Sequence, residues 1–170
     1  MLRESFFFLF VLLVVATNWL SAQSPQNHWM GLTPLKSTRL DVEKTLGKPV
    51  NAKLHLYETG NEKIRVWYSQ GTCKKDKTHI WNVPVDTVLQ VLVSPKQILS
   101  AENLKSRIAL PLTKETDPSG RDTYLYYTED WSIKFQTKSL SNGTEDVIFI
   151  TYAPSKSDFD LRCSNLKNKH

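Results

Sequence analysis

The sequence predicts an α+β protein in which short helices pack on an antiparallel sheet, built from two tandem helix-plus-three-strand repeats. Three observations lead to this prediction. Apolar and polar residues alternate over several short segments, which is the period of half-buried strands. Two other short segments carry the capping signals of helices. The pattern of the first half of the chain also recurs in the second half.

Residues 1–22 have the pattern of a cleaved signal peptide. Arg3 precedes an apolar run from Phe6 to Ala16, and the small residue Ala22 stands at the expected cleavage site. An uncleaved membrane anchor is the alternative, but the apolar run is shorter than the ~20 residues that a spanning helix needs. We therefore expect an exported protein, periplasmic or extracellular, whose mature chain of about 150 residues has no transmembrane segment.

The segment from Thr38 to Leu46 is predicted to form the first helix. Thr38 is a suitable N-cap, and Asp41 three residues later completes a capping-box pattern. Gly47 stands where a left-handed residue commonly ends a helix. A helix this short is marginal by itself, so we expect the face that carries Val42 to be buried.

The other elements follow from the same kind of local signal. A second short helix is predicted at 98–108, with Ser100 as its cap. The prolines and glycine within 110–121 predict a loop, and Asn142-Gly143 predicts a tight turn. The strands are predicted from alternating or continuous apolar runs at 52–57, 63–68, 87–93, 123–128, 131–136 and 146–152.

The two halves of the chain match each other. Residues 57–66 correspond to 126–135 at one constant offset, and 86–95 correspond to 145–154 at a second offset. Chance agreement between β-rich segments is the alternative. The expected regions after the signal peptide are a first repeat at 23–95, a second repeat at 96–163 and a flexible tail at 164–170.

Cys73 and Cys163 are the only cysteines, and in an exported chain they predict one disulfide. This bond would tie the C-terminal tail to a loop in the middle of the chain. The alternatives are two free thiols, or a metal site that includes His79. The spacing lacks the paired ligands of zinc sites, so we expect no metal ion and no cofactor.

The net charge is +5, a mild excess that is spread along the chain. The one local cluster is Lys74, Lys75 and Lys77. A solvated loop explains this cluster better than a site for nucleic acid or anionic lipid does. We therefore expect no nucleic-acid partner.

The segment 31–49, together with 81–84 and 161–163, resembles a group of uncharacterised exported bacterial proteins. More distantly, a helix that ends in Leu46-Gly47-x-Pro49 and precedes a hairpin is similar to the BamE/SmpA small-lipoprotein family. Two such units in tandem are similar to the β-lactamase inhibitor protein family. The resemblance implies the repeat but no activity. BamE-like lipoproteins carry an N-terminal cysteine for their lipid, which this chain lacks, so a role in outer-membrane assembly is not implied.

No catalytic motif is present, and no catalytic residue is predicted. The four histidines lie in different segments, and no nucleophile elbow, HExxH motif, phosphate loop or nucleotide fingerprint occurs. The pairs Glu129–Asp130 and Asp158–Asp160 are the nearest to acid/base pairs, but both lie in predicted turns or loops. A secreted hydrolase whose site is assembled from scattered residues is the alternative.

The first predicted hairpin carries the candidate binding residues. If Leu54 and Leu56 pack under the helices, then Tyr57, Arg65 and Trp67 project to the opposite face, where aromatic and cationic groups favour recognition. We predict a non-enzymatic binding or structural module of the cell envelope, whose open sheet face binds an envelope or secreted protein, or a glycan. The alternative is that Tyr57 and Trp67 cover the sheet edge or a neighbouring loop.

Overall fold

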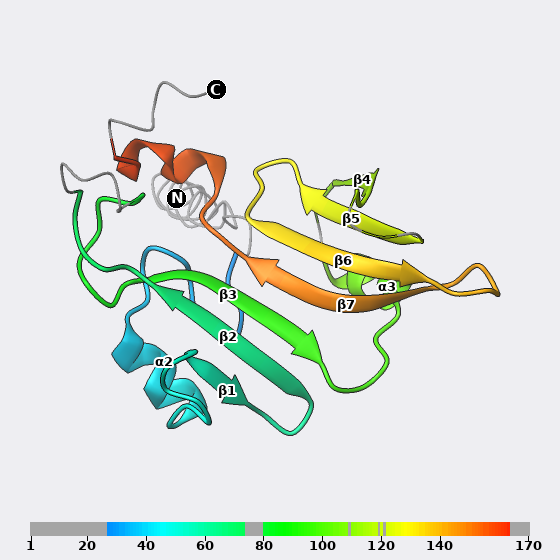
Figure 1. Ribbon diagram of the computed structural model, residues 1–170. Helices are drawn as coiled ribbons and strands as arrows, with labels where there is room; N and C mark the ends of the chain where they lie inside the picture. Colours follow the sequence, from blue (N-terminus) through cyan, green and yellow to red (C-terminus); the bar gives the residue numbers. More distant parts are fainter. Residues whose placement is uncertain (1–26, 74–79, 109, 119, 121, 164–170) are drawn as a thin grey trace, which may run out of the picture.

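The computed structural model describes residues 27–73, 80–108, 110–118, 120 and 122–163 (Figure 1). Three of the predicted features lie outside this range. They are the signal peptide, the lysine cluster with the neighbouring His79, and the tail. The predicted division between repeats at residue 95 is not tested by the fold alone, and it stays a prediction.

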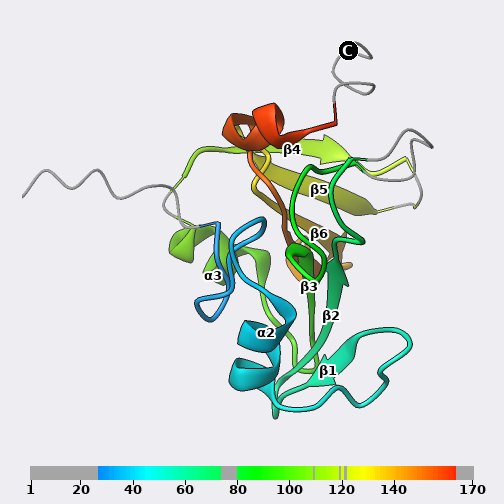
Figure 2. The ribbon, with the colours of Figure 1, turned by 90° about the vertical axis from the view of Figure 1, so that its left-hand side faces the viewer.

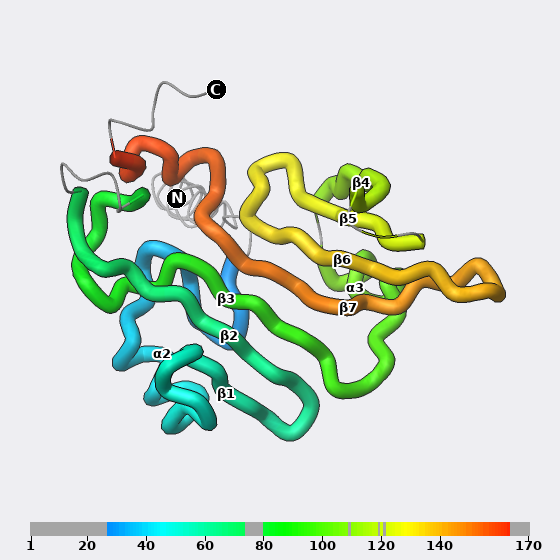
Figure 3. The backbone as a smooth tube through the Cα atoms, in the orientation of Figure 1, coloured from blue at the N-terminus to red at the C-terminus, as the bar shows by residue number. Residues whose placement is uncertain are grey.

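One antiparallel sheet forms the centre of the fold, and the α+β prediction is confirmed. Its strands are β1 (Leu56–Glu58), β2 (Glu62–Tyr68), β3 (Val88–Pro95), β4 (Leu112–Thr116), β5 (Thr123–Thr128), β6 (Ile133–Ser139) and β7 (Glu145–Tyr152). They lie in the order β1-β2-β3-β7-β6-β5-β4. Two three-stranded meanders, β1-β2-β3 and β5-β6-β7, therefore meet at β3 and β7, as the backbone trace shows (Figure 3). Strand β4 extends the second meander at its edge.

Two short α-helices, α2 (Arg39–Leu46) and α3 (Ala101–Arg107), lie on the same side of the sheet (Figure 2). The 3₁₀ helix η2 (Lys156–Leu161) follows the last strand and was not predicted. Among the described residues, no helix has the length and apolarity that crossing a bilayer requires.

Helix α2 begins and ends where the sequence predicts. The Thr38 N–H donates to Asp41 Oδ2 at 2.8 Å, and the Asp41 N–H donates to Thr38 Oγ1 at 3.4 Å, which is the predicted capping box. Gly47 ends the helix with φ +78°. Val42 is fully buried, as expected. The predicted cap of the second helix is also confirmed, because Ser100 Oγ accepts from the Asn103 N–H at 3.2 Å.

The prediction of a loop over 110–121 is wrong, because this segment contains strand β4. Pro111, Pro118 and Gly120 flank the strand and do not interrupt it. Strand β4 pairs with β5 along its whole length, but it lies at the edge of the sheet, where most of its residues are exposed. A solvated edge strand needs no apolar alternation, so the sequence signal was absent.

The alternation predicted for the first strand is wrong by one residue. The strand begins only at Leu56, because residues 52–55 form a turn in which His55 adopts φ +49°. Tyr57 pairs directly with Ile64, and both are fully buried. Leu54, which was expected in the core, is 46% exposed. Directly paired residues share a face of the sheet, so Tyr57 points toward the helices.

The core fills the space between one face of the sheet and the two α-helices. The helices contribute Val42, Ala101 and Leu104, and the segment before α2 contributes Trp29 and Leu32. The sheet contributes its buried side chains, which include Tyr57, Ile64, Val66, Val91, Val93, Phe135 and Ile150. None of the α-helices among the described residues lies on the opposite face of the sheet (Figure 2).

The predicted disulfide between Cys73 and Cys163 is present, with 5.5 Å between the two Cα atoms. It connects the loop after β2 to the end of η2. Backbone hydrogen bonds strengthen this connection, because the Cys163 N–H donates to Ile80 O at 3.0 Å and the Asn82 N–H donates to Leu161 O at 2.7 Å. The C-terminal segment is thereby held against the loop that precedes β3.

Candidate functional site: the open face of the sheet

One row of directly paired residues crosses all the strands on the face opposite α2 and α3. Its members, from β1 to β4 across the sheet, are Leu56, Arg65, Leu92, Thr151, Lys134, Tyr127 and Thr113. Figure 1 shows the sheet from this side, with α3 behind it. We call this surface the open face.

Two of the three predicted binding residues lie on the open face. Arg65 is exposed and Trp67 is half-buried, and the Arg65 Cζ atom lies 4.8 Å from the centroid of the Trp67 ring. This distance is that of a cation–π contact. Tyr57 does not join them, which corrects its predicted placement. Its hydroxyl group lies on the core side, 3.0 Å from the hydroxyl of Tyr68.

A second group of cations and an aromatic ring lies at the start of β6. Trp131 is 39% exposed, and the Nζ atoms of Lys156 and Lys134 lie 4.8 Å and 5.7 Å from the centroid of its ring. Trp131 was predicted as a strand residue, but it occupies the turn before β6 with φ +63°. Its N–H donates to Thr128 O at 2.9 Å, which closes the turn and presents the indole at the surface.

Strands β3 and β7 lie between the two groups. Leu92 and Thr151 stand between Arg65 and Lys134 in the same row. In the next row, Phe149 pairs with Gln136, which pairs with Leu125, and all three are half-buried. The span between the cations therefore combines the half-buried apolar side chains of Leu92 and Phe149 with the buried polar side chain of Thr151.

Within the described part of the chain, Arg65, Lys134 and Lys156 have no carboxylate within ion-pair distance. Among the described residues, the ion pairs involve Arg39, Lys96 and Lys114 and none of the open-face cations named above. Arg65, Lys134 and Lys156 instead lie on tryptophan rings. An aromatic ring stabilises a cation but leaves its charge uncompensated.

A cavity of about 300 Å³ lies beside Trp131 and is the nearest approach to an enzyme site. Its lining consists of Leu110, Pro111, Thr128, Glu129, Asp130 and Lys156. Asp130 Oδ1 accepts from Thr128 Oγ1 at 2.6 Å and from Ser132 Oγ at 2.8 Å, while Oδ2 is buried and has no hydrogen-bond partner among the described residues. Burial favours a higher pKa for Asp130, but these hydrogen bonds outweigh it and lower the pKa. Asp130 is therefore suited to hold the turn as an anion and not to donate a proton.

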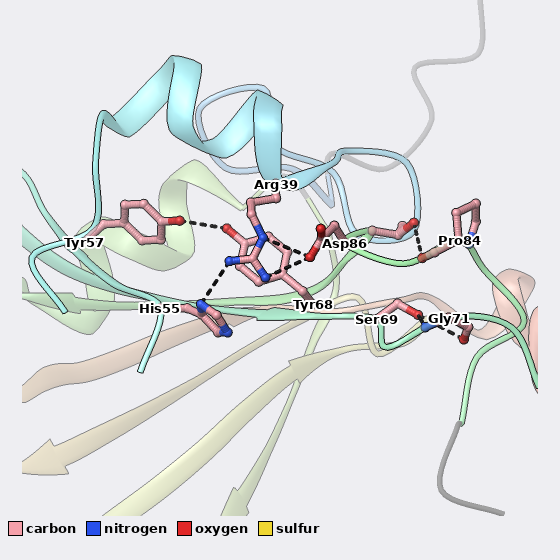
Figure 4. Close-up of polar contacts among 9 residues, drawn as sticks. Arg39, His55, Tyr57, Tyr68, Ser69, Gly71, Pro84 and Asp86 are labelled. Carbon is pink, nitrogen blue, oxygen red and sulfur yellow. Dashed lines mark hydrogen bonds and ion pairs between the residues drawn. The ribbon is translucent and has the colours of Figure 1, made fainter. Parts of the chain in front are cut away.

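A polar cluster that the sequence analysis missed lies on the helix side of the first meander (Figure 4). The Arg39 guanidinium donates through Nε to Asp86 Oδ1 at 2.9 Å and lies 3.2 Å from His55 Nδ1. Since arginine only donates, His55 Nδ1 must accept, so the proton of the neutral ring is on Nε2. Burial and the charge of Arg39 lower the pKa of His55. The Arg39 Cζ atom also lies 4.2 Å from the centroid of the Tyr68 ring.

The second meander holds a comparable cluster around Glu145. This carboxylate accepts from Lys114 Nζ at 2.6 Å, from Thr137 Oγ1 at 2.8 Å and from the Tyr126 hydroxyl at 2.9 Å. Lys105 Nζ donates to the same tyrosine hydroxyl at 3.0 Å. A cavity of about 380 Å³ adjoins the cluster between α3 and the β6–β7 hairpin.

The predicted repeat is the sequence signal that relates the acidic residues of the two clusters. Asp86 and Glu145 stand at matched positions of the repeat, and so do Tyr57 and Tyr126. In each half, the acidic residue near the start of the last strand pairs with a cation that lies on a tyrosine ring: Asp86 pairs with Arg39 on Tyr68, and Glu145 pairs with Lys114 on Tyr124.

The remaining candidates for chemistry have structural partners or stand apart. Asp158 accepts from the Ser155 N–H at 2.7 Å and caps η2. His28 is exposed at the start of the described chain, far in sequence from the His55 cluster. No group of three or more metal-ligating side chains occurs in the part of the chain that the structure describes.

No protein-family model and no curated protein matches this sequence. A solved structure with some similarity is that of a DUF4309 family protein (YjgB) from Bacillus subtilis. It is 19% identical, the match covers 76% of this chain and 86% of that chain, and the TM-score is 0.43. A similarity at this level carries no argument about function. The resemblances to exported bacterial proteins and to the BamE/SmpA family stay predictions.

Proposed function

We propose that this protein is an exported, non-enzymatic module that binds another protein through the open face of its sheet. One observation carries the proposal. One sheet face carries two cation–tryptophan groups with Leu92 and Phe149 between them, and among the described residues no carboxylate forms an ion pair with these cations. Aromatic residues and arginine are the types enriched at protein interfaces. Export is supported by the disulfide, because such bonds persist in oxidising compartments.

We further propose that the two meanders are tandem copies of one helix-plus-three-strand unit. The register between them supports this proposal. Leu92 and Thr151 stand at matched positions of the sequence repeat, and they pair with each other. Their neighbours pair crosswise, Val91 with Tyr152 and Val93 with Ile150. A two-fold relation between similar units gives this kind of register.

The variant Trp67→Ala tests the binding function. The mature protein is immobilised, exposed to an extract of the cell envelope, and the retained proteins are identified. We expect Trp67→Ala to lose a specifically retained protein while its thermal midpoint stays close to that of the wild type, since Trp67 is only half-buried. Leu40→Ala is the matched control, because Leu40 is 74% exposed on α2, on the other side of the sheet.

Two outcomes would count against the proposal. If the thermal midpoint of the Trp67→Ala protein lies far below that of the wild type, the indole serves to pack the fold. If the Trp67→Ala protein retains the same partner as the Leu40→Ala protein, the open face is not the interface. The Tyr57→Ala protein shows how large a packing defect is in this fold, for comparison with Trp67→Ala. Removal of the fully buried Tyr57 side chain is expected to lower the free energy of unfolding by about 3 to 5 kcal/mol.

A secreted hydrolase is the second candidate function. The observation in its favour is that Glu129, Asp130 and Lys156 line one cavity. Hydrolysis of ester, glycoside or peptide substrates by the mature protein, abolished by Glu129→Gln and retained by Trp67→Ala, would establish it. Absence of such activity would leave the binding function as the better explanation.

A further inference from the structure

The two cation–tryptophan groups of the open face define the chemistry of a partner, and this inference rests on the proposed binding function. Arg65 and Lys134 belong to the same cross-strand row, with Leu92 and Thr151 between them. Neighbouring strands are about 4.8 Å apart, so the three steps from β2 to β6 place the two Cα positions roughly 14 Å apart. The open face is therefore a strip with a cation at each end.

Uncompensated cations select an anionic partner. Arg65 lies on Trp67, and Lys134 and Lys156 lie on Trp131, while no carboxylate of the described residues forms an ion pair with them. Carboxylates bind arginine and lysine through short, charge-assisted hydrogen bonds. Glu115 also lies on this side of the sheet, but on edge strand β4, beyond the span between the two cations.

The spacing selects an extended segment. An extended chain rises about 3.3 Å per residue, so two side chains four residues apart are about 13 Å apart and point to the same side. The residue midway between them also points to that side. In an α-helix the same separation spans only about 6 Å, which does not reach from one cation to the other. The residue midway along the segment would lie over Leu92 and Thr151, where an apolar side chain fits.

We propose that the open face binds an extended acidic polypeptide segment of the pattern acidic-x-apolar-x-acidic, which crosses the strands from Arg65 to Lys134. One carboxylate pairs with Arg65 beside Trp67, and the other pairs with Lys134 and Lys156 beside Trp131. The half-buried Leu92 and Phe149 within this span favour a polypeptide over an anionic glycan, because a glycan has no apolar side chain to cover them.

Synthetic peptides test this proposal on the full mature protein. The probe is the labelled peptide Ser-Asp-Thr-Leu-Thr-Asp-Ser, and its Kd is measured by fluorescence anisotropy. The peptide Ser-Asp-Asp-Thr-Leu-Thr-Ser has the same composition with adjacent carboxylates, and Ser-Lys-Thr-Leu-Thr-Lys-Ser reverses the charge. We expect the first peptide to bind most tightly, the second more weakly and the third not at all, with weaker binding of the first at high salt.

Substitutions on the face complete the test. Arg65→Gln and Lys134→Gln are each expected to weaken binding of the first peptide about tenfold, because each removes one charge-assisted hydrogen bond. Lys36→Gln is the matched control, since Lys36 is exposed and lies in the segment before α2. It is expected to leave the Kd unchanged.

Three outcomes would overturn the proposal. They are equal binding of acidic and basic peptides, no effect of Arg65→Gln and Lys134→Gln on the Kd, and binding of a sulfated polysaccharide by a protein that does not bind the acidic peptide. If the peptides fail but the extract still yields a protein whose retention depends on Trp67, the binding function stands and only the assigned partner chemistry is wrong. If both experiments fail, the proposed function fails with it.

Discussion

Tyr57 and Trp67 show that the backbone conformation of a preceding residue decides which face of the sheet a side chain occupies. Both are aromatic residues of the first hairpin, and a simple alternation from Ala52 places them on the same face. The left-handed His55 interrupts that alternation, so strand β1 starts with Leu56 on the open face and Tyr57 in the core. The alternation in β2 is uninterrupted from Glu62 to Trp67, and there the prediction for Arg65 and Trp67 agrees with their placement.

Glu145 gives a prediction about pH. Burial favours a higher pKa for this carboxyl, but hydrogen bonds from Lys114, Thr137 and Tyr126 outweigh it, so its pKa lies below the ordinary value of 4.5. The unfolded chain therefore takes up this proton at a higher pH than the folded chain does. The stabilisation by Glu145 is complete above the unfolded pKa and is lost as the pH falls through the folded pKa.

The variant Glu145→Gln tests this contribution. Urea unfolding of both proteins between pH 7 and pH 3 should show a variant that is about 1 to 3 kcal/mol less stable at pH 7, since hydrogen bonds to a charged group are lost. The difference in unfolding free energy between the two proteins should shrink toward pH 3. Below the unfolded pKa, Glu145 becomes protonated in the unfolded wild-type chain, and the folded state then loses the advantage of its charged carboxylate. A difference that stays constant over this range would contradict the depressed pKa.

At the scale of elements, the helix caps carry their own prediction. Thr38→Ala removes the side-chain oxygen that accepts from the Asp41 N–H, so α2 should lose about 1 kcal/mol of stability. The shift of the thermal midpoint measures this loss. Thr45→Ala in the last turn is the control, because Thr45 Oγ1 only bonds back to Asp41 O within the helix. Equal shifts for the two variants would show that the cap contributes no more than any exposed threonine.

Strand β4 and helix η2 mark the limit of element prediction. Both are short and polar, so neither carries the periodicity that predicted the other elements. Strand β4 exists because the edge of β5 offers it backbone partners. Helix η2 lies between the end of β7 and the disulfide at Cys163. The partner of β4 is the next strand along the chain, whereas the disulfide that follows η2 reaches Cys73, 90 residues away.

At the scale of the whole molecule, the disulfide is the strongest single restraint that the sequence predicted. The two cysteines are separated by 90 residues, and closing a loop of that length is worth roughly 4 to 5 kcal/mol in the chain-entropy model. The double variant Cys73→Ser with Cys163→Ser should therefore unfold at a clearly lower temperature. Wild-type protein treated with a reductant should match it. An unchanged midpoint in both experiments would show that the hydrogen bonds around Ile80 and Asn82 hold the segment without the bond.

The sequence by itself determined the features that depend on neighbours along the chain. The caps at Thr38 and Ser100, most of the strands and the turn at Asn142-Gly143 belong to this group, because capping, alternation and turn chemistry act over a few residues. The disulfide was predictable for another reason, because the sequence holds only two cysteines. The repeat stays a prediction, in which Asp86 matches Glu145.

Only the tertiary structure decided which residues meet across the sheet. Arg65 and Lys134 lie in different halves of the chain, and no local pattern relates them. They share a row because β3 and β7 pair where the two meanders meet, with Leu92 opposite Thr151. Register between strands that are distant in sequence is set by packing of the whole sheet against its helices, so the candidate site appears only when the fold is complete.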